Sequence, residues 1–338
     1  MHDEQIGVPE PPNYGGDPIR LVAVVNSFNR QALLETSLSS LTSALRQLPF
    51  GTAIVVFEAG STDGSVEWLR EYQSSCSVPE VLILAPVPGE DSSFAAGVNA
   101  GCRHAIDRYP ELQWLFLFET DNSIAGCEPI ALATRLLDSH VQLAATGFTV
   151  TKHSGQPAGF GCSLPSVLQF LIGQQLSAIL GLGRPRLRAE PPFDGYPWGT
   201  CDVVFTSPLL VKRTAWEETA GFDAASFPFS DSDLDWCWRA QRDGWKLAVI
   251  ELKGVVHDNE DQASAWSSRR VLNFHRARFR LLQRHLRVQT FLLKLGLLAR
   301  HILEFMALAL ASPMLSHPGG SLKKRWLLIT TVMQGYRD

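Results

Sequence analysis

The sequence lacks the cysteine spacing of a metal-binding or disulfide-stabilised protein. Its six cysteines are scattered over 338 residues without a C-x-x-C pair, which argues against a structural zinc site and a disulfide framework. Residues 1–18 are polar and rich in Pro and Gly, so they lack the basic and then apolar segments of a signal peptide. We therefore expect a flexible N-terminus over residues 1–18 and a cytoplasmic protein.

A glycine-rich dinucleotide-binding turn is also absent. Residues 19–26, IRLVAVVN, lead into SFNR instead of G-x-G-x-x-G, which disfavours a Rossmann dehydrogenase. The chain is 45% hydrophobic and 19% charged, which is the balance of a globular protein and excludes bulk disorder.

Positive charge is scarce in most of the chain and concentrated at its end. Residues 269–338 carry 13 Lys and Arg against two acidic residues, a net charge of +11, whereas residues 1–268 carry −15. A basic segment of this kind suits nucleic acid or an anionic membrane surface. We expect no nucleic-acid partner, because the segment has no recognisable binding motif and is strongly apolar over residues 290–312.

The apolar stretch at 290–312 is long enough to span a bilayer but is interrupted by charged residues. Lys294, His301 and Glu304 fall near one face of a helix, so the pattern favours an amphipathic helix lying on the inner face of the cell membrane. The alternative is a helix that packs on the rest of the chain or on a second subunit of a homo-oligomer.

From residue 19, strand-like and helix-like runs alternate. The runs IRLVAVVN, TAIVVFE, EVLILAP and QWLFLF are short and apolar, and the segments between them have helical spacing. This alternation predicts an α/β fold, in which helices flank a mostly parallel sheet. Further along, we predict a short helix over residues 165–183 and a long Pro-rich connection over residues 184–199.

Polar residues follow these runs, at the sheet edge where α/β proteins bind ligands. Glu119 and Asp121 end the run FLF, and carboxylates there can hold Mg²⁺ or Mn²⁺ together with substrate phosphates; the alternative is an ordinary acidic turn. His257 ends another apolar run and is either a metal ligand or a structural histidine. Asp63, in GSTDGS, is either a ligand of a ribose or phosphate or a helix cap.

The segment SDSDLDWCWRA, residues 230–240, combines carboxylates with tryptophans. Asp231 and Asp233 are either an acidic cluster at a helix N-terminus or a general base, since one carboxylate beside another can have its pKa shifted toward the working pH.

Taken in order, these segments resemble the family 2 glycosyltransferases, inverting enzymes of the GT-A fold, and bacterial rhamnosyltransferases among them. VVNSFNR is similar to the family's first-strand motif, GSTDGSVEWL to its nucleoside-binding turn, and SFAAGVNAG to its helix beside the diphosphate. FLFETDN falls at the D-x-D metal motif, and AGFDAASFPFSDSDLDWCWRAQRDGW is similar to the segment that carries the base. The resemblance implies a Rossmann-like GT-A domain over residues 19–268, followed by a basic helical extension over residues 269–338.

The resemblance also implies the chemistry: metal-dependent transfer of a hexosyl or deoxyhexosyl group from a nucleotide-sugar donor to a hydroxyl of a saccharide or lipid-linked acceptor. Asp233 is the implied base, with Asp231 as its rival, and Asp121 and His257 are the implied ligands of Mg²⁺ or Mn²⁺. The implied nucleotide-binding residues are Asn26, Phe28, Asn29, Glu58, Asp63, Ser93, Asn99, Glu119 and Thr120. By position in the chain, we expect Trp198 and Gly199 to contact the acceptor. The alternative function is a catalytically inactive protein that binds nucleotide sugars or serves in an assembly.

Overall fold

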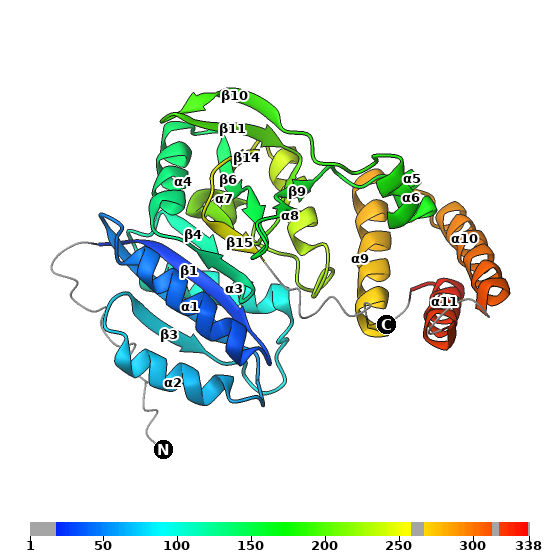
Figure 1. Cartoon of the computed structure of the whole chain (residues 1–338), viewed down its shortest axis with the longest axis horizontal. Helices are drawn as coiled ribbons and strands as arrows, with labels where there is room; N and C mark the ends of the chain where they lie inside the picture. The colour runs from blue at the N-terminus through cyan, green and yellow to red at the C-terminus, as the bar shows by residue number, and fades with distance from the viewer. Residues whose placement is uncertain (1–17, 258–266, 313–317, 337–338) are drawn as a thin grey trace, which may run out of the picture.

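A computed structural model describes residues 18–257, 267–312 and 318–336 (Figure 1). The predicted flexible segment 1–18 therefore lies almost wholly outside the described residues. The strands are β1 (Ile19–Ser27), β2 (Gly51–Glu58), β3 (Glu80–Leu84), β4 (Trp114–Leu117), β5 (Asn122–Ile124), β6 (Leu143–Phe148), β7 (Val150–Thr151), β8 (Pro157–Gly159), β9 (Gly161–Cys162), β10 (Arg188–Phe193), β11 (Tyr196–Cys201), β12 (Val203–Val204), β13 (Leu209–Lys212), β14 (Lys246–Ile250) and β15 (Val255–His257). The helices are α1 (Gln31–Leu45), α2 (Ser65–Ser75), α3 (Phe94–Arg108), α4 (Glu128–Ser139), α5 (Val167–Ile172), α6 (Gln174–Ile179), α7 (Arg213–Glu218), α8 (Ser232–Arg242), α9 (Ser268–Leu286), α10 (Thr290–Ala311) and α11 (Pro318–Met333).

The main sheet of the described residues has nine strands in the order β10-β11-β14-β6-β13-β4-β1-β2-β3. The β1, β2, β3 and β4 pairings are parallel, as the alternation of strands and helices predicts. Strand β13 runs antiparallel between β4 and β6, and β14 continues parallel to β6. The sheet is therefore mixed at its centre, and the carboxyl ends of β1, β2 and β4 share one edge.

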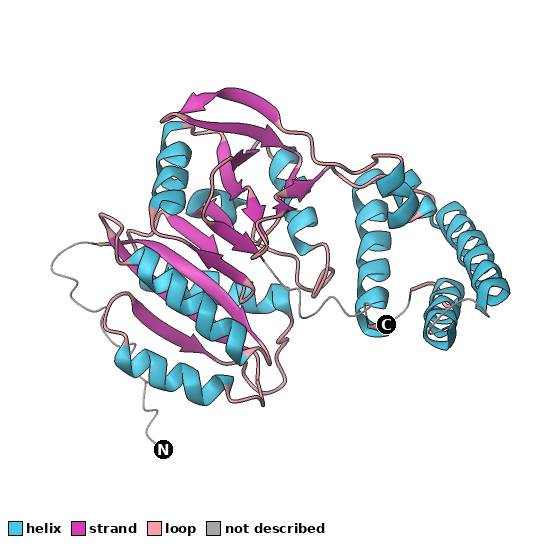
Figure 2. Cartoon of the chain, in the orientation of Figure 1, coloured by secondary structure: helices cyan, strands magenta, loops and turns pink. Residues whose placement is uncertain are grey.

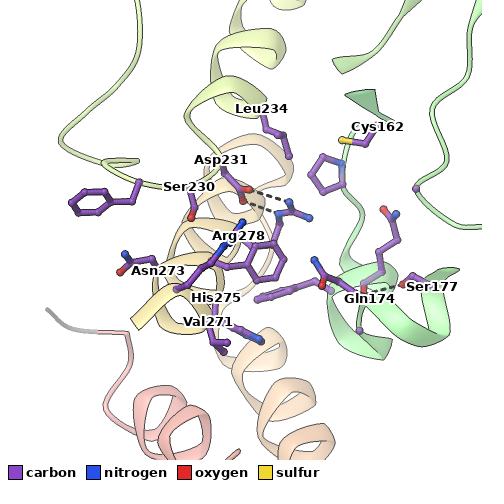
Figure 3. Close-up of a pocket in the computed structure, with 18 of the residues that line it drawn as sticks. Cys162, Gln174, Ser177, Ser230, Asp231, Leu234, Val271, Asn273, His275 and Arg278 are labelled. Atoms are coloured by element: carbon purple, nitrogen blue, oxygen red, sulfur yellow. Dashed lines mark hydrogen bonds and ion pairs between the residues drawn. The ribbon is translucent and has the colours of Figure 1, made fainter. Parts of the chain in front are cut away.

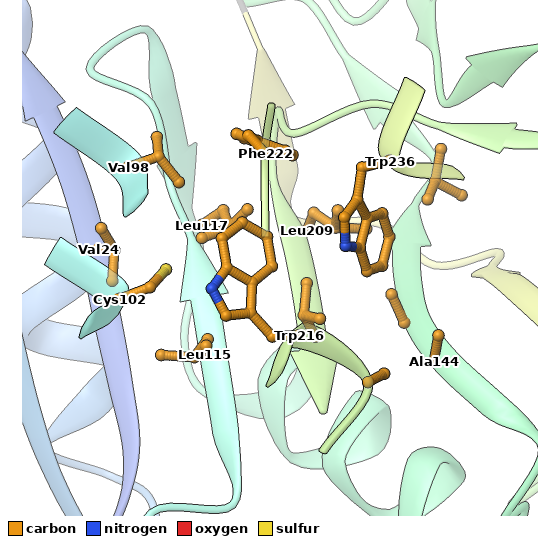
Figure 4. Close-up of a cluster of buried hydrophobic side chains, with 14 of the residues drawn as sticks. Val24, Val98, Cys102, Leu115, Leu117, Ala144, Leu209, Trp216, Phe222 and Trp236 are labelled. Carbon is orange, nitrogen blue, oxygen red and sulfur yellow. The ribbon is translucent and has the colours of Figure 1, made fainter. Parts of the chain in front are cut away.

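Apolar side chains are buried on both faces of this sheet, because β1 sends alternate residues to opposite sides. Val22 and Val24 pack with α3, α7 and α8 on one face, whereas Leu21 and Val25 pack with α1, α2 and α4 on the other. On the first face, Trp216 lies between the strands and the neighbouring aromatic rings (Figure 4). This two-sided core explains why the strand sequences are almost continuously apolar.

A second sheet of the described residues, in the order β5-β15-β7-β8, lies beside the end of β4. Its β5 and β15 strands are antiparallel, and their register pairs His257 with Asn122. Two segments that are 135 residues apart in the sequence thereby meet directly after β4.

Two expectations for the middle of the chain are wrong. The helix expected over residues 165–183 is two helices, α5 and α6, separated at Gly173 with φ +86°. The Pro-rich stretch 184–199 includes the β10 strand and the first four residues of its hairpin partner β11, rather than being only a connection. The turn residues Asp194 and Gly195 both have positive φ, which is the D-G hairpin signal that this stretch already contained.

The last three helices stand to one side of the α/β body (Figure 2). Their small core joins Phe279 of α9, Leu293 and Leu297 of α10 and Val332 of α11, and it also includes Phe170 of α5. The extension is therefore completed by a helix from the middle of the chain and is not confined to residues 269–338.

Helix α10 turns a polar edge inward and an apolar face outward. His301 is fully buried, whereas residues along the opposite face are exposed, namely Phe291, Leu292, Leu295, Ile302, Leu303, Met306 and Leu310. Among the described helices, none combines the length and apolar character needed to cross a bilayer.

Candidate active site

A cavity of about 1560 Å³ lies where the carboxyl edge of the sheet meets the C-terminal helices. Its walls come from the segment after β4, the start of α8, α5 and α6, and α9 to α11. Five predicted site residues from three distant parts of the sequence line this one cavity, namely Glu119, Asp121, Asp231, Asp233 and His257.

Asp121 is buried in the turn between β4 and β5, where the Arg30 guanidinium and the His257 imidazole approach it. Its Oδ2 accepts a hydrogen bond from Arg30 Nη1 at 3.3 Å, and its Oδ1 lies 3.4 Å from His257 Nδ1. His257 is held there by the pairing of β15 with β5, and its Nδ1 also lies 3.0 Å from Asn122 Oδ1. Burial alone would raise the pKa of Asp121, but its contacts with His257 and Arg30 lower it. Asp121 is therefore held as a carboxylate.

Glu119 faces the same cavity in a different electrostatic state. Its Oε1 accepts a hydrogen bond of 2.6 Å from Thr206 Oγ1. Burial and the neighbouring charge of Asp121 raise the pKa of Glu119. Two carboxyl groups two residues apart therefore have pKa values shifted in opposite directions.

Asp231 is bound by the C-terminal extension. Arg278 of α9 donates from Nε to Asp231 Oδ2 at 2.7 Å and from Nη2 to Oδ1 at 3.0 Å (Figure 3). Asp231 stands immediately before α8 with φ +60°, so this salt bridge also stabilises an unusual backbone conformation. Both carboxylate oxygens of Asp231 are thus engaged by the Arg278 guanidinium.

Asp233 is the second residue of α8 and is half-buried. Burial, followed by the charge of Asp231, raises the pKa of Asp233 to about 7. Its Oδ1 accepts a hydrogen bond from the Leu234 backbone N–H at 3.0 Å, which fixes the carboxyl group. A carboxyl with this pKa exchanges protons near neutral pH, as a general base requires.

The predicted nucleotide residues at the ends of β1 and β2 lie together beside the cavity rather than in its wall. Asn29 joins their two loops, because its Oδ1 accepts from the Thr62 N–H at 2.7 Å. Glu58 accepts from the Ser61 N–H at 2.6 Å, and its other oxygen, Oε2, is buried without a partner. Asn26 Oδ1 is likewise buried and unpartnered. These two atoms are polar groups for which the folded chain supplies no hydrogen bond.

The other predicted nucleotide residues have varied surroundings. Phe28 is 55% exposed at the tip of the first loop. Asp63 accepts from the backbone N–H of Gln31 at 3.0 Å and from Ser65 Oγ at 2.6 Å, and the N-cap residue of α2 is its neighbour Gly64. Its pKa is lowered, chiefly by the hydrogen bond from Ser65. Ser93 accepts from the Ala96 N–H and caps α3.

Four further predicted residues also lie outside the cavity wall. Thr120 is buried in the turn after β4. Asn99 binds both the N–H and the C=O of Phe222, at 2.9 and 2.7 Å, and fixes the loop that leads to α8. Trp198 is buried in β11 and donates to the Pro191 carbonyl at 2.8 Å, and its neighbour Gly199 packs against the Arg188 backbone. Trp198 and Gly199 thus do not line the cavity, and their contact with an acceptor stays a prediction.

The side chains around Asp121 suit a hard cation that takes only one or two of its ligands from the protein. Within the described residues there is no group of three or more His, Cys, Asp and Glu side chains arranged to hold a metal. Asp121 Oδ1, however, is buried without a hydrogen-bond partner and faces His257. Mg²⁺ and Mn²⁺ bind through one or two protein groups when water and phosphate supply the rest, so these residues fit such an ion.

Three residues of the site were missed from sequence. Arg30 ends the first-strand motif and could have been found there, since a cation close to an acidic strand end suits a diphosphate. Thr206 and Arg278 gave no such signal, because the contacts of Thr206 with Glu119 and of Arg278 with Asp231 depend on the tertiary fold.

No family model matches the sequence, and no curated protein matches it. Among solved structures, the chain is similar to the mannosyltransferase PcManGT from Pyrobaculum calidifontis in complex with GDP-Man and Mn²⁺. The match has 13% identity and a TM-score of 0.51 and covers 97% of this chain and 89% of that one. The chain is also similar to GalNAc-T7 with UDP, GalNAc and Mn²⁺, with 12% identity and a TM-score of 0.55, over 94% of this chain and 56% of that one. The chain has the GT-A fold, which confirms the predicted fold class.

Proposed function

We propose that the protein is a glycosyltransferase that moves a hexosyl or deoxyhexosyl group from a nucleotide-sugar donor to an acceptor hydroxyl with inversion. The observation that carries this proposal is the convergence of Asp121 and Asp233 on one cavity. They come from segments more than a hundred residues apart, and their pKa values are shifted in opposite directions. The fold shared with PcManGT and GalNAc-T7, whose structures hold nucleotides or nucleotide sugars, supports the same class of donor.

Asp233 is the general base in this proposal. With a pKa of about 7, a substantial fraction of the carboxyl is ionised near neutral pH and can accept the proton of the acceptor hydroxyl. The acceptor oxygen forms a bond to the anomeric carbon while the bond from that carbon to the diphosphate breaks. Asp231 keeps its negative charge beside Arg278 and acts by setting the pKa of Asp233.

The donor occupies the carboxyl edge of the sheet. The loops after β1 and β2 meet the nucleoside, where Asn26 and Glu58 carry unpartnered buried oxygens. Arg30 faces Asp121 at the cavity and is placed to pair with the diphosphate. Asp121 and His257 would hold a divalent cation, which when bound neutralises charge on the departing nucleoside diphosphate.

The outward apolar face of α10 adds a peripheral membrane contact to the proposal. Exposed leucines on this face, together with the basic Lys323 and Lys324 of α11, combine apolar area with positive charge, as interfacial helices do.

A binding panel tests the proposed function. UDP-, dTDP- and GDP-sugars are titrated by thermal shift with Mn²⁺, and release of the nucleoside diphosphate is then followed for each donor that binds. We expect one base to be preferred and slow hydrolysis of its sugar donor. Absence of binding to every donor would overturn the proposal, and binding without any release would favour the inactive, assembly-type protein instead.

A further inference from the structure

The cavity has a second, strongly basic end that the proposed reaction does not use. Arg269 and Arg270 on the first turn of α9, Arg300 of α10, and Lys324 and Arg325 of α11 all line it. Among the described residues of these three helices, Glu304 is the only carboxylate that lines the cavity. Leaving Arg270 aside, four cations face one anion among these described residues, which is an excess of positive charge.

The charges at this end are held in fixed positions. Glu304 accepts from Arg300 Nε at 3.0 Å and lies 2.8 Å from Arg325 Nη1, so one carboxylate bridges two guanidinium groups. Arg300 is fixed further by donating from Nη1 to the Phe170 carbonyl at 2.7 Å. The adjacent Lys324 has no ion pair with a described residue.

Arg278 separates this basic end from the carboxylates of the reaction site. It binds Asp231 on one side, and on the other it is among the cations that, after burial, hold the pKa of His275 well below its usual value. Arg300 and Arg325 contribute to the same effect, so His275 and Arg278 lie where the positive charge gathers. The cavity thus runs from Asp121 and Asp233, past Arg278, to the cluster around Arg300 and Lys324.

We propose that this basic end binds a phosphate or diphosphate group of the acceptor, while the acceptor hydroxyl lies at Asp233. The inference rests on the proposed function and names its acceptor class. Like charges held together are unfavourable unless an anion joins them, and guanidinium groups match phosphate oxygens in geometry. In the proposed function, the donor diphosphate lies at Arg30 and Asp121. The cations at the basic end therefore form a separate, anion-binding subsite.

The surroundings of the subsite indicate a lipid as the carrier of that phosphate. Leu176 of α6 lines the cavity and is also exposed at its margin, and Ile179 and Leu180 beside it are exposed. An acceptor with a phosphate head and an apolar tail would therefore satisfy the cations and cover these side chains.

Two double variants of equal charge test the subsite. Arg269→Ala/Lys324→Ala removes two cations from the cavity, whereas Arg242→Ala/Lys246→Ala removes two exposed cations that do not line it. Farnesyl diphosphate, inorganic pyrophosphate and farnesol are titrated calorimetrically into each protein. EDTA is present throughout, so that metal-mediated binding at the donor end is absent.

We expect the parent and the exposed-site variant to bind farnesyl diphosphate within about twofold of each other. The cavity variant should bind at least ~10-fold more weakly, as loss of charge-assisted hydrogen bonds implies. If farnesyl diphosphate binds more tightly than pyrophosphate, the carrier is a lipid. If the two probes bind equally, and both depend on the two cations, the acceptor is a soluble phosphorylated molecule. If the double variant unfolds, Lys324→Ala is compared with Lys246→Ala as a milder version of the same test.

Each of three results would overturn the subsite. The first is equal affinity of both double variants, and the second is farnesol binding as tight as that of farnesyl diphosphate. The third is no binding of any probe to the parent. The donor panel is run on the same proteins. Loss of farnesyl diphosphate binding with intact donor binding removes only this inference, whereas absence of donor binding in the parent removes the proposed function.

Discussion

Arg278 and Asp231 form a largely buried, two-bonded salt bridge between the first helix of the extension and the residue before α8. Asp233 is two residues away, and the negative charge of Asp231 contributes to its raised pKa. The extension therefore supplies the countercharge that limits how far the pKa of Asp233 rises.

Replacing Arg278 by Ala should shift the acid limb of the reaction to higher pH. Without the guanidinium, the full charge of Asp231 acts on Asp233 and raises its pKa above 7. The uncompensated buried carboxylate should also lower the free energy of unfolding by about 3 kcal/mol. The pH profile of kcat/KM and urea unfolding measure the two effects. Arg278→Lys should give intermediate values, and an unshifted profile in the Ala variant would contradict the coupling.

Asp233→Asn should lower turnover by about 10² or more and leave donor binding intact, since a general base contributes roughly that factor. In the parent, kcat/KM should rise as pH increases through about 7, because the ionised carboxyl is the active form. Steady-state kinetics from pH 5.5 to 8.5 check both. Turnover within a few-fold of the parent would assign the base elsewhere.

The same substitution has a predictable effect on stability. The pKa of Asp233 is about 7 in the folded chain, against an ordinary value of 3.8. Between these pH values the folded chain holds a proton that the unfolded chain releases, so raising the pH disfavours folding of the parent. The Asn variant lacks this ionisation, and its Tm relative to the parent should therefore be higher at pH 8 than at pH 4. A difference in Tm that does not change with pH would contradict the raised pKa.

Asp121→Ala should weaken donor binding and abolish its response to Mn²⁺. The substitution removes the carboxylate oxygen that is buried without a hydrogen-bond partner and the group that faces Arg30 and His257. Calorimetric titration of the preferred donor, with Mn²⁺ and with EDTA, measures both properties. Donor affinity in the parent that is the same in EDTA would refute the metal assignment.

Asp235→Asn should destabilise the fold by about 3 kcal/mol at pH 7, because it disrupts a buried charge cluster. Asp235 is fully buried and bonds to Arg239 at 2.8 Å, His285 at 2.9 Å and Arg284 at 3.1 Å. Burial alone would raise the pKa of Asp235, but these bonds lower it. Its stabilisation should therefore be complete above about pH 4 and decline as the pH falls further. Asp243→Asn at an exposed site is the control, and equal urea midpoints for the two variants would contradict the role.

Leu303→Gln/Met306→Gln should reduce sedimentation with vesicles of phosphatidylglycerol and phosphatidylcholine. These side chains are 67% and 55% exposed on the outward face of α10, so the substitutions remove apolar contact without opening a core. Val87→Gln/Val141→Gln changes two exposed residues of the α/β body and should sediment as the parent does. Equal sedimentation of all three proteins would favour packing or oligomer contact for this helix.

The α/β fold could be predicted because each buried strand is a short apolar run that stands apart from its neighbours. The apolar runs at residues 19–26 and 52–58 correspond to β1 and β2, and the carboxylates after FLF lie at the predicted edge of the sheet. The β10–β11 hairpin was missed because its prolines obscured the strand pattern, although Asp194-Gly195 is a hairpin signal.

The partners within the site could not be predicted, because they depend on long-range packing. The sequence indicates Asp233 as the base with Asp231 as its rival, and the surroundings of the two carboxyl groups differ in the structure. The arginines of α9 were read as a surface for an external anion. Two of them instead neutralise carboxylates of the body, since Arg284 pairs with Asp223 at 2.6 Å as well as with Asp235.

Because of these ion pairs, helix α9 and the segment from Asp223 to Asp235 depend on each other's side chains. A chimera that exchanges the last seventy residues for those of a relative would leave Asp231 and Asp235 facing foreign side chains. Engineers who recombine such proteins should therefore move both pieces together. Over evolutionary time, the same constraint should make substitutions in α9 and in the start of α8 occur in pairs.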